Sequence, residues 1–233
     1  LDVQIGEPNV NPLAVQGPKA ETLMSRVFGE EVRSIRFFRG KMLDFQGHQF
    51  YVARSGWSKQ GGFEIYVDND QLALPLWDSL CEHGQDLNVR AGCPNAIERL
   101  ESGLLSYGND MTRDNNPFEC GMDPFIDIDD DIESLSVQAL RDIRGHHKRQ
   151  LVGIVCSCEM PLSMAPILDD QGNEVGAITS QAWSPRYRRR LGFAILDRSY
   201  VETRKTLEMD GHRGKITGLP FTADDLQQPL EFS

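Results

Sequence analysis

A glycine-rich loop between two strand-like segments is the feature of this chain that most restricts its fold. Residues 51–53 and 63–67 are typical of β-strands, because β-branched and aromatic side chains dominate them. Gly56, Gly61 and Gly62 lie between the two segments. Glycine adopts positive φ at little steric cost, so a tight loop can form here. The pattern predicts two strands of one sheet joined by this loop.

The second strand has two different faces. Phe63, Ile65 and Val67 alternate with Glu64 and Tyr66, and successive side chains of a strand point to opposite sides of the sheet. The apolar set suits a core, which leaves a carboxylate beside an aromatic ring on the other face. That face, with Trp57 from the loop, would suit a planar ligand that carries N–H donors. The alternative, a surface hairpin with a solvated Glu64, stays open.

The segments around this hairpin predict an α+β layer. We expect a strand at 11–17, a helix at 18–28 that ends at Gly29, and two short strands within 32–50 that turn near Gly40 or Gly47. A helix at 71–82 follows, with its N-cap in 68–70 and its end at Gly84. This order of elements is typical of helices packed on one face of a sheet.

The second half of the chain predicts a small all-β barrel or sandwich after two short helices. The helices are expected at 95–102 and 136–142, and Glu101, Asp110 and Glu119 are expected to orient loops by accepting backbone N–H bonds. Strands are predicted at 151–156, 165–168, 174–179, 191–196 and 206–209, with a hairpin turn at 169–172. The basic run 185–190 is expected to pack on a neighbouring domain or to attract an anionic group.

Composition narrows the class of protein. The chain has 233 residues, a formal net charge of -11 and a pI of about 4.9, which disfavours nucleic acid and anionic membranes as partners. No apolar run approaches the roughly 20 residues of a membrane span. The 5 cysteines are irregularly spaced, which predicts reduced thiols and a cytoplasmic protein. No metal site is expected.

Several ordered blocks resemble one known family. The segment Arg54-Ser-Gly-Trp-Ser-Lys-Gln-Gly-Gly-Phe-Glu-Ile-Tyr66 resembles the "R-x-G-Y-T-G-E-D-G-x-E-I" segment of the glycine cleavage T-protein (aminomethyltransferase) family. Residues 13–20 resemble its "L-x-x-Q-G-P-x-A", residues 104–111 and 116–122 resemble its "L-Y-G-x-D" and "P-x-E-A-G-L" blocks, and 176–185 resemble its "G-x-x-T-S…S-P".

The resemblance implies a fold, a cofactor and a site. The implied fold is α+β and T-protein-like: residues 1–135 form the latter part of a folate-binding domain, and residues 146–233 form a C-terminal β-barrel. The family uses tetrahydrofolate. Its folate-binding glutamate corresponds to Glu64, and the aromatic residues that contact the pterin correspond to Trp57 and Tyr66. No catalytic residue is assigned, because the family's catalytic segment has no counterpart here. We therefore expect a C-terminal portion of the family's length.

Two details favour one branch of the family. The Trp-Ser-Lys-Gln form of the loop resembles the dimethylsulfoniopropionate demethylases, and Asn95 follows Pro94 where T-proteins carry an arginine. The resemblance thus implies a methyltransferase whose methyl donor is dimethylsulfoniopropionate, with a homodimer as one expected form. The alternatives are an aminomethyltransferase of glycine cleavage, an aromatic O-demethylase and a non-catalytic folate-binding module.

Overall fold

The computed structural model describes residues 2–93, 95–131 and 133–227. The chain divides into two compact units, Leu1–Asn95 and Ala96–Ser233, and each unit is described by itself. The predicted domains, 1–135 and 146–233, follow the resemblance to a family, whereas the compact units follow contacts in space. The domain boundaries therefore stay a prediction.

The first unit is built on a four-stranded antiparallel sheet with the order β1-β4-β3-β2. Its strands are β1 (Asn11–Gln16), β2 (Gly40–Phe45), β3 (His48–Ala53) and β4 (Gly62–Val67). The strand predicted at 11–17 is confirmed and ends one residue earlier, at Gln16; the pair of strands that flanks the glycine-rich loop is confirmed as well.

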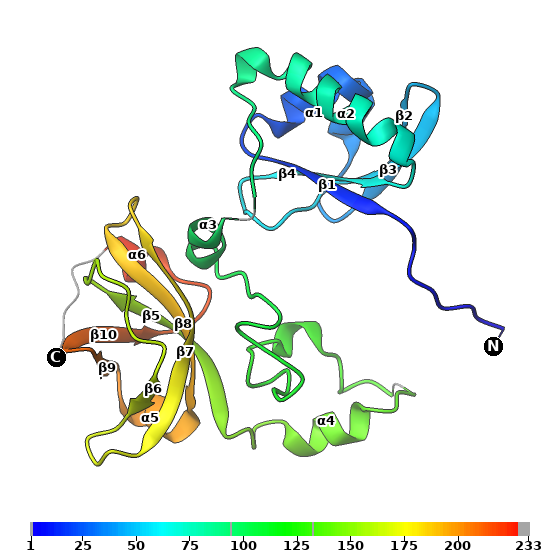
Figure 1. The fold of residues 1–233 in the computed structure, drawn as a ribbon. Coiled ribbons are helices and arrows are strands. Elements are labelled where there is room, and N and C mark those ends of the chain that lie inside the picture. The colour runs from blue at the N-terminus through cyan, green and yellow to red at the C-terminus, as the bar shows by residue number, and fades with distance from the viewer. Residues whose placement is uncertain (1, 94, 132, 228–233) are drawn as a thin grey trace. The chain divides into compact units, whose positions relative to one another are not determined.

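Two helices cover one face of this sheet, α1 (Ala20–Phe28) and α2 (Asp70–His83) (Figure 1). The expected apolar face of β4 points toward them, because Phe63, Ile65 and Val67 are buried in the same core as Leu23 and Leu76. Helix α2 begins where the sequence predicts, since the Asn69 side chain accepts a hydrogen bond from the Gln71 backbone N–H at 3.1 Å.

One prediction for this unit is wrong in detail. The first of the two strands expected within 32–50 begins only at Gly40, because Glu30–Ser34 forms a short 3₁₀ helix, η1, after Gly29. Only Val32 of these five residues is buried, and a single buried apolar side chain does not give the alternation that a strand needs. The turn between β2 and β3 lies at Gln46 and Gly47, both with positive φ, as a tight hairpin requires.

The second unit contains a six-stranded antiparallel sheet that curls into a near-closed barrel (Figure 1). The strand order is β6-β7-β8-β5-β10-β9. The bounds are β5 (Arg149–Cys156), β6 (Pro166–Leu168), β7 (Glu174–Ser184), β8 (Arg189–Asp197), β9 (Thr206–Met209) and β10 (His212–Thr217). The expected α+β fold with a C-terminal barrel is confirmed.

Strand β5 is buried on both faces and divides two cores. Val152 and Ile154 belong to the core that also holds Leu196 and Leu207. Leu151 and Val155 belong to a second core. Because successive side chains alternate between faces, one strand can serve both cores, and its near-continuous apolar sequence follows from this.

Short helices accompany the barrel. They are α3 (Ala96–Glu101), the one-turn 3₁₀ helix η3 (Asp123–Phe125), α4 (Val137–Ile143), α5 (Arg198–Thr203) and α6 (Ala223–Gln227); the first unit also ends in one, η2 (Gln85–Leu87). Helices α3 and α4 agree with the sequence prediction within one residue at each end. Leu100 of α3 and Leu226 of α6 are buried in the second core, with Phe221.

Two strands of the barrel differ from the sequence prediction. Strand β7 continues to Ser184 instead of ending near Thr179, and a register shift lies between Ile178 and Ser180. Strand β10 was not predicted, because His212, Arg213 and Lys215 hide the apolar alternation of its short sequence. Its pairing with β5 and β9 completes that side of the barrel.

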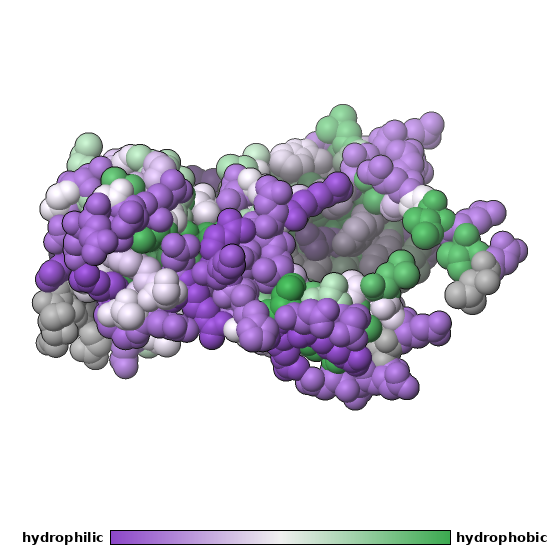
Figure 2. Space-filling view, turned by 90° about the horizontal axis from the view of Figure 1, so that it is seen from below, coloured by the Kyte–Doolittle hydropathy of each residue, from purple (hydrophilic) through white to green (hydrophobic). Residues whose placement is uncertain are grey.

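The surface agrees with the composition. Hydrophilic residues dominate the face seen in Figure 2, and apolar residues appear there in small groups. The five cysteines are free thiols, as predicted. Burial raises the pKa of Cys120 and of Cys156 above the ordinary value of a thiol, which keeps both in the less reactive protonated form.

Candidate functional site

The open face of the first unit's sheet presents Glu64 between two small residues. The strand register places Ala14 of β1 opposite Glu64 on one side and Ala53 of β3 opposite it on the other. Directly opposed residues of antiparallel strands point to the same face. Alanine is short, so these neighbours leave space around the half-buried Glu64 carboxylate.

A row of rings lies next to this carboxylate on the same face. Tyr66 of β4 is opposed by Tyr51 of β3 and by Pro12 of β1. The two tyrosine rings have centroids 5.7 Å apart and are tilted by 56°. The Tyr51 ring packs over Gly40 of β2, where an added Cβ would collide with it. The face therefore combines an acceptor with an aromatic surface, as the sequence predicts.

One oxygen of Glu64 is held by the loop that precedes its strand. The Ser55 hydroxyl donates a hydrogen bond to Glu64 Oε2. In the described part of the chain, the other oxygen, Oε1, accepts no hydrogen bond. The carboxylate is thus oriented from one side and can still accept N–H bonds from a ligand.

Trp57 lies in the loop between Ser55 and Ser58 and exposes 38% of its surface. The Gln16 side chain contacts both ends of this loop: its Nε2 donates to the Ser55 carbonyl at 3.0 Å and to the Phe63 carbonyl at 3.2 Å. The Ser58 hydroxyl donates to Gln16 Oε1 at 3.0 Å. The loop that carries Trp57 is therefore fastened to strand β1.

Arg54 fixes the beginning of the same loop. Its guanidinium donates to the Ile35 carbonyl at 3.2 Å and to Glu21 Oε2 of α1 at 2.7 Å, and it stacks over the Phe63 ring at 5.4 Å. The hydrogen bond from Arg33 lowers the pKa of Glu21, partial burial opposes this, and the bond from Arg54 adds to it. Charged contacts thus anchor the loop to helix α1.

The structure places the sequence-predicted residues as follows. Glu64 and Tyr66 share the open face of β4, two residues apart, and Trp57 comes from the loop instead of the strand. Sequence reasoning missed Gln16, Ser55 and Tyr51. The signal for Tyr51 was available, because it alternates with the buried Phe50 and Val52; the contacts of Gln16 could not be predicted, because they span 39 and 47 residues.

Pro94 lies outside the described residues, so the predicted Pro-Asn pair is seen only through Asn95. In the residues that the structure describes, no three His, Cys, Asp or Glu side chains are grouped as metal ligands. Among the same residues, no helix is both long enough and apolar enough to cross a membrane.

A second polar cluster lies in the barrel unit around Asp110. It is buried, and both oxygens of its carboxylate already accept hydrogen bonds. Asp110 is 0% exposed. Its Oδ2 accepts from Arg99 at 2.6 Å and from the Ser106 backbone N–H at 2.8 Å, and its Oδ1 accepts from the hydroxyls of Thr179 and Ser180. With four donors, this carboxylate has no capacity left for a ligand.

The bulge in β7 explains how two consecutive residues reach one carboxylate. Thr179 and Ser180 would point to opposite faces of a regular strand. The register shift between Ile178 and Ser180 leaves Thr179 as the extra residue of a bulge, which re-aims its side chain. Both hydroxyls can therefore bind Asp110, which connects the segment after α3 to the barrel wall.

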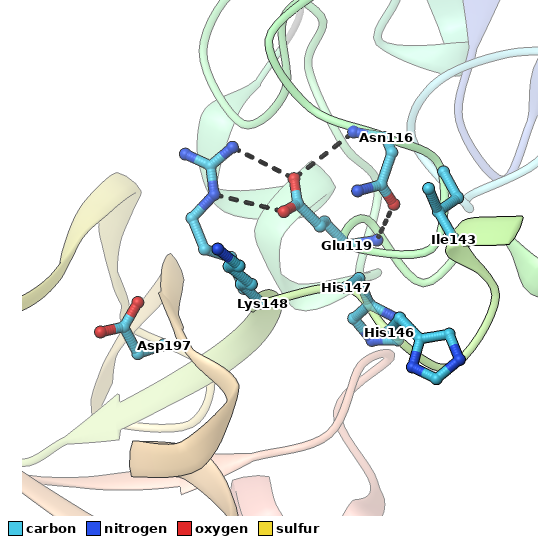
Figure 3. Close-up of a pocket in the computed structure, with 8 residues that line it drawn as sticks. Asn116, Glu119, Ile143, His146, His147, Lys148 and Asp197 are labelled. Carbon is cyan, nitrogen blue, oxygen red and sulfur yellow. Dashed lines mark hydrogen bonds and ion pairs between the residues drawn. The ribbon is translucent and has the colours of Figure 1, made fainter. Parts of the chain in front are cut away.

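A surface pocket of the barrel unit has a volume of about 400 Å³ (Figure 3). It is lined by Asn116, Glu119, Ile143, His146, His147, Lys148, Arg149 and Asp197. Glu119 accepts from Arg149 at 3.2 Å and from the Asn116 backbone N–H at 3.4 Å. The prediction that Asp110 and Glu119 orient loops is thus confirmed, whereas Glu101 accepts from the Ser184 hydroxyl instead of a backbone N–H.

This pocket is a weaker candidate than the open face of the first unit. Its cationic and anionic side chains are balanced, and Glu119 is already paired. Among the described residues that line it, the only rings are the imidazoles of His146 and His147. The open face, in contrast, offers tyrosine rings beside a carboxylate with a free oxygen.

Comparisons with known proteins agree with this architecture. The sequence pattern described as "GCVT N-terminal domain" matches residues 2–130, and that of the "Glycine cleavage T-protein C-terminal barrel domain" matches residues 149–222. The solved aminomethyltransferase T of Bartonella henselae superposes with a TM-score of 0.73 at 22% identity, over 93% of this chain and 60% of its own, which supports the fold alone.

Two curated relatives differ in their similarity to this chain. The dimethylsulfoniopropionate demethylase DmdA of Ruegeria pomeroyi is 53% identical over 86% of this chain and 55% of its own length. An aminomethyltransferase of Bacillus cereus is 30% identical over 91% of this chain and 59% of its own length. The chain therefore spans a little over half the length of these relatives. With patterns of both family domains matched in order, the chain belongs to the glycine cleavage T-protein family, a family of folate-dependent transferases that use tetrahydrofolate as a cosubstrate.

Proposed function

We propose that this chain is part of a tetrahydrofolate-dependent methyltransferase that acts on dimethylsulfoniopropionate, and that the open face of β4 binds the pterin. The observation that carries the proposal is the 53% identity to a dimethylsulfoniopropionate demethylase. It is supported by a face on which Glu64 and Tyr66 lie side by side in the register of β4.

The chemistry of the face suits a pterin. The pterin ring is planar and carries N–H groups at one edge, for which Glu64 supplies a charged acceptor. The rings of Tyr66 and Trp57 supply flat apolar surface for the ring faces. The alanines opposite Glu64 leave room for a ring edge to approach the carboxylate.

The proposed reaction needs little acid or base catalysis from this part of the chain. The N5 amine of tetrahydrofolate attacks the sulfonium methyl group, the carbon–sulfur bond breaks to release a neutral thioether, and the N5 proton is lost to solvent. The neutral leaving group needs no proton, so the main task of the protein is to hold two reacting centres in line. Glu64, Trp57 and Tyr66 would hold one partner in place, and we assign no catalytic residue to this chain.

An aminomethyltransferase of glycine cleavage is the second candidate. The relatives that carry this name support it, but at 28–30% identity, well below the 53% of the demethylase. Asn95 also disfavours it, because an amide cannot supply the positive charge of the arginine expected there. A folate-binding module without catalysis is the third candidate, since the chain covers only part of its relatives' length.

Two measurements separate these candidates. Calorimetry with tetrahydrofolate should give saturable binding by the chain. A turnover assay of the intact protein with dimethylsulfoniopropionate and tetrahydrofolate should yield methylated folate and a thioether. Turnover of the glycine cleavage reaction alone would contradict the demethylase proposal, and binding with neither reaction would favour the non-catalytic module.

A further inference from the structure

Every hydrogen-bonding group of the Gln16 side chain has a partner within the first unit. An amide side chain has two N–H donors and one carbonyl acceptor. Both donors of Gln16 are occupied, by the carbonyls of Ser55 and Phe63, and its oxygen accepts from the Ser58 hydroxyl. A side chain with every group bonded has one favourable orientation, so Gln16 is a rigid feature at the end of β1.

These bonds close the loop at both of its ends. Ser55 is near the beginning of the loop and Phe63 follows its last glycine, while the Gly17 backbone N–H adds a bond to the Gly61 carbonyl at 2.9 Å. A loop of this length would otherwise sample several conformations, and ordering it costs conformational entropy. Gln16 supplies the contacts that offset this cost before any ligand arrives.

Two glycines let the loop backbone approach the amide. At Gly56 an added Cβ would overlap the Gln16 amide, and at Gly62 it would overlap both that amide and the Val15 carbonyl. Both glycines have positive φ, 155° and 153°, which other residues rarely adopt. The glycine-rich sequence of the loop is therefore explained by the close approach of Gln16.

The contacts of Gln16 lead to two of the three residues proposed to bind the ligand, Glu64 and Trp57. Ser55 accepts from Gln16 through its carbonyl and donates to Glu64 through its hydroxyl. Trp57 lies between Ser55 and Ser58, both of which are bonded to Gln16. One side chain on β1 thus holds the partner of Glu64 and both sides of Trp57.

We infer that Gln16 is a positioning residue for the folate-binding site: it sets the place of Trp57 and the orientation of Glu64 without contacting the ligand itself. The inference rests on the proposed function. It predicts a preorganised loop, so that removal of the amide lowers affinity by loosening the site.

The test uses Gln16→Met, which keeps the length of the side chain and removes all three hydrogen bonds. The control is Gln49→Met, because Gln49 lies on the same sheet and is exposed, with one bond to Asp44 at 3.3 Å. Both are made with Trp77 and Trp183 replaced by Phe, so that fluorescence reports Trp57 alone. Trp57 anisotropy is measured without ligand, and tetrahydrofolate affinity by calorimetry.

We expect Gln16→Met to lower the anisotropy of Trp57 and to raise the tetrahydrofolate Kd about tenfold, the scale of one to two net hydrogen bonds. Gln49→Met should change neither quantity. Ser58→Ala leaves both bonds from the Gln16 amide in place and removes only the bond to Gln16 Oε1 and the weaker one, at 3.3 Å, from the Gln60 backbone N–H. It is the milder variant should Gln16→Met fail to fold, and it should raise the Kd about threefold.

Different failures are distinguishable. If the parent protein binds tetrahydrofolate and the Gln16 and Ser58 variants bind it equally well, the positioning role is wrong and the proposed function survives. Equal losses in Gln16→Met and Gln49→Met would also overturn the role, because the effect would then be general to the sheet. If the parent protein does not bind tetrahydrofolate at all, the proposed site is wrong, and the role of Gln16 toward it is wrong as well.

Discussion

The two carboxylates at the centres of the two polar networks differ in how many donors they have. Asp110 in the barrel unit is 0% exposed and accepts four hydrogen bonds, one of them from the buried Arg99. Glu64 in the first unit is half-buried and accepts from Ser55 alone among the described residues. Both lie near segments that resemble family motifs, so resemblance does not distinguish their roles.

The difference teaches how to separate a structural carboxylate from a binding one. A buried charge is costly unless it is paired, so a saturated carboxylate such as Asp110 is explained by the fold that surrounds it. A carboxylate with an unused oxygen, flanked by alanines and beside aromatic rings, gains little for folding and retains capacity for a ligand. Mutations at the two sites should therefore affect different measurements.

The largest expected effect is on stability, at Asp110. Asp110→Asn keeps the size of the side chain and removes its charge, which leaves the Arg99 guanidinium buried without its ionic partner. Breaking such a pair costs about 3–5 kcal/mol. Urea denaturation followed by Trp183, the tryptophan of the barrel unit, should show this loss.

Asp127→Asn is the matched control, because Asp127 is exposed in the same unit; we expect less than about 0.5 kcal/mol there. Tetrahydrofolate affinity of the folded Asp110 variant should stay unchanged. Equal stability of the two variants, or a loss of affinity in folded Asp110→Asn, would contradict the structural role.

The next largest effect is on binding, at Glu64. Glu64→Gln keeps the shape and removes the charge, so the acceptor for the pterin N–H groups is weaker. Calorimetry should show tetrahydrofolate binding weakened by about 1–3 kcal/mol, the scale of a hydrogen bond to a charged group. Glu82→Gln on the exposed side of α2 changes the net charge equally and should leave affinity intact. Unchanged affinity in Glu64→Gln would remove this residue from the site.

A smaller effect is expected at Trp57. Stacking contributes about 0.5–1.5 kcal/mol beyond area burial, so Trp57→Ala should raise the Kd several-fold or more and Trp57→Phe much less. Tetrahydrofolate should quench Trp57 fluorescence in the parent protein. Trp77→Phe is the matched control, because Trp77 has nearly the same exposure, 39% against 38%, but lies on helix α2. Identical quenching curves for the parent and Trp57→Phe would exclude Trp57 from the site.

Features that depend on neighbouring residues could be predicted from the sequence, whereas contacts between distant segments could not. The two faces of β4 could be predicted, because alternation is local and Phe63, Ile65 and Val67 fill a core. The binding of Gln16 to Ser55 could not, because two segments far apart in the chain meet only after the sheet forms.

The barrel shows the same limit. The bulge at Thr179 and the buried pair of Arg99 with Asp110 depend on contacts between distant segments. In the sequence Arg99 is indistinguishable from a solvated helix residue, because a charged side chain in a short helix is usually exposed.

The smallest expected effect is electrostatic and concerns the ion pair between Glu21 of α1 and Arg54 at the beginning of the loop. Glu21 bridges Arg33 at 2.9 Å and Arg54 at 2.7 Å, and it exposes 37% of its side chain. The hydrogen bond from Arg33, and secondarily the one from Arg54, lowers the pKa of Glu21. A carboxyl whose pKa is lowered by folding stabilises the fold above its unfolded pKa, about 4.3, and this contribution disappears as pH falls through the folded value.

Glu21→Gln should therefore cost at most about 1 kcal/mol near neutral pH, the scale of exposed pairs, and progressively less in acid. Thermal unfolding of the parent and the variant from about pH 6 to about pH 3, with Glu82→Gln as a control without a charged partner in the described structure, measures the difference. A gap between parent and variant that stays constant over this range would contradict the assignment, whereas a closing gap would show that the loop has an ionic anchor at α1 that is separate from the neutral one at Gln16.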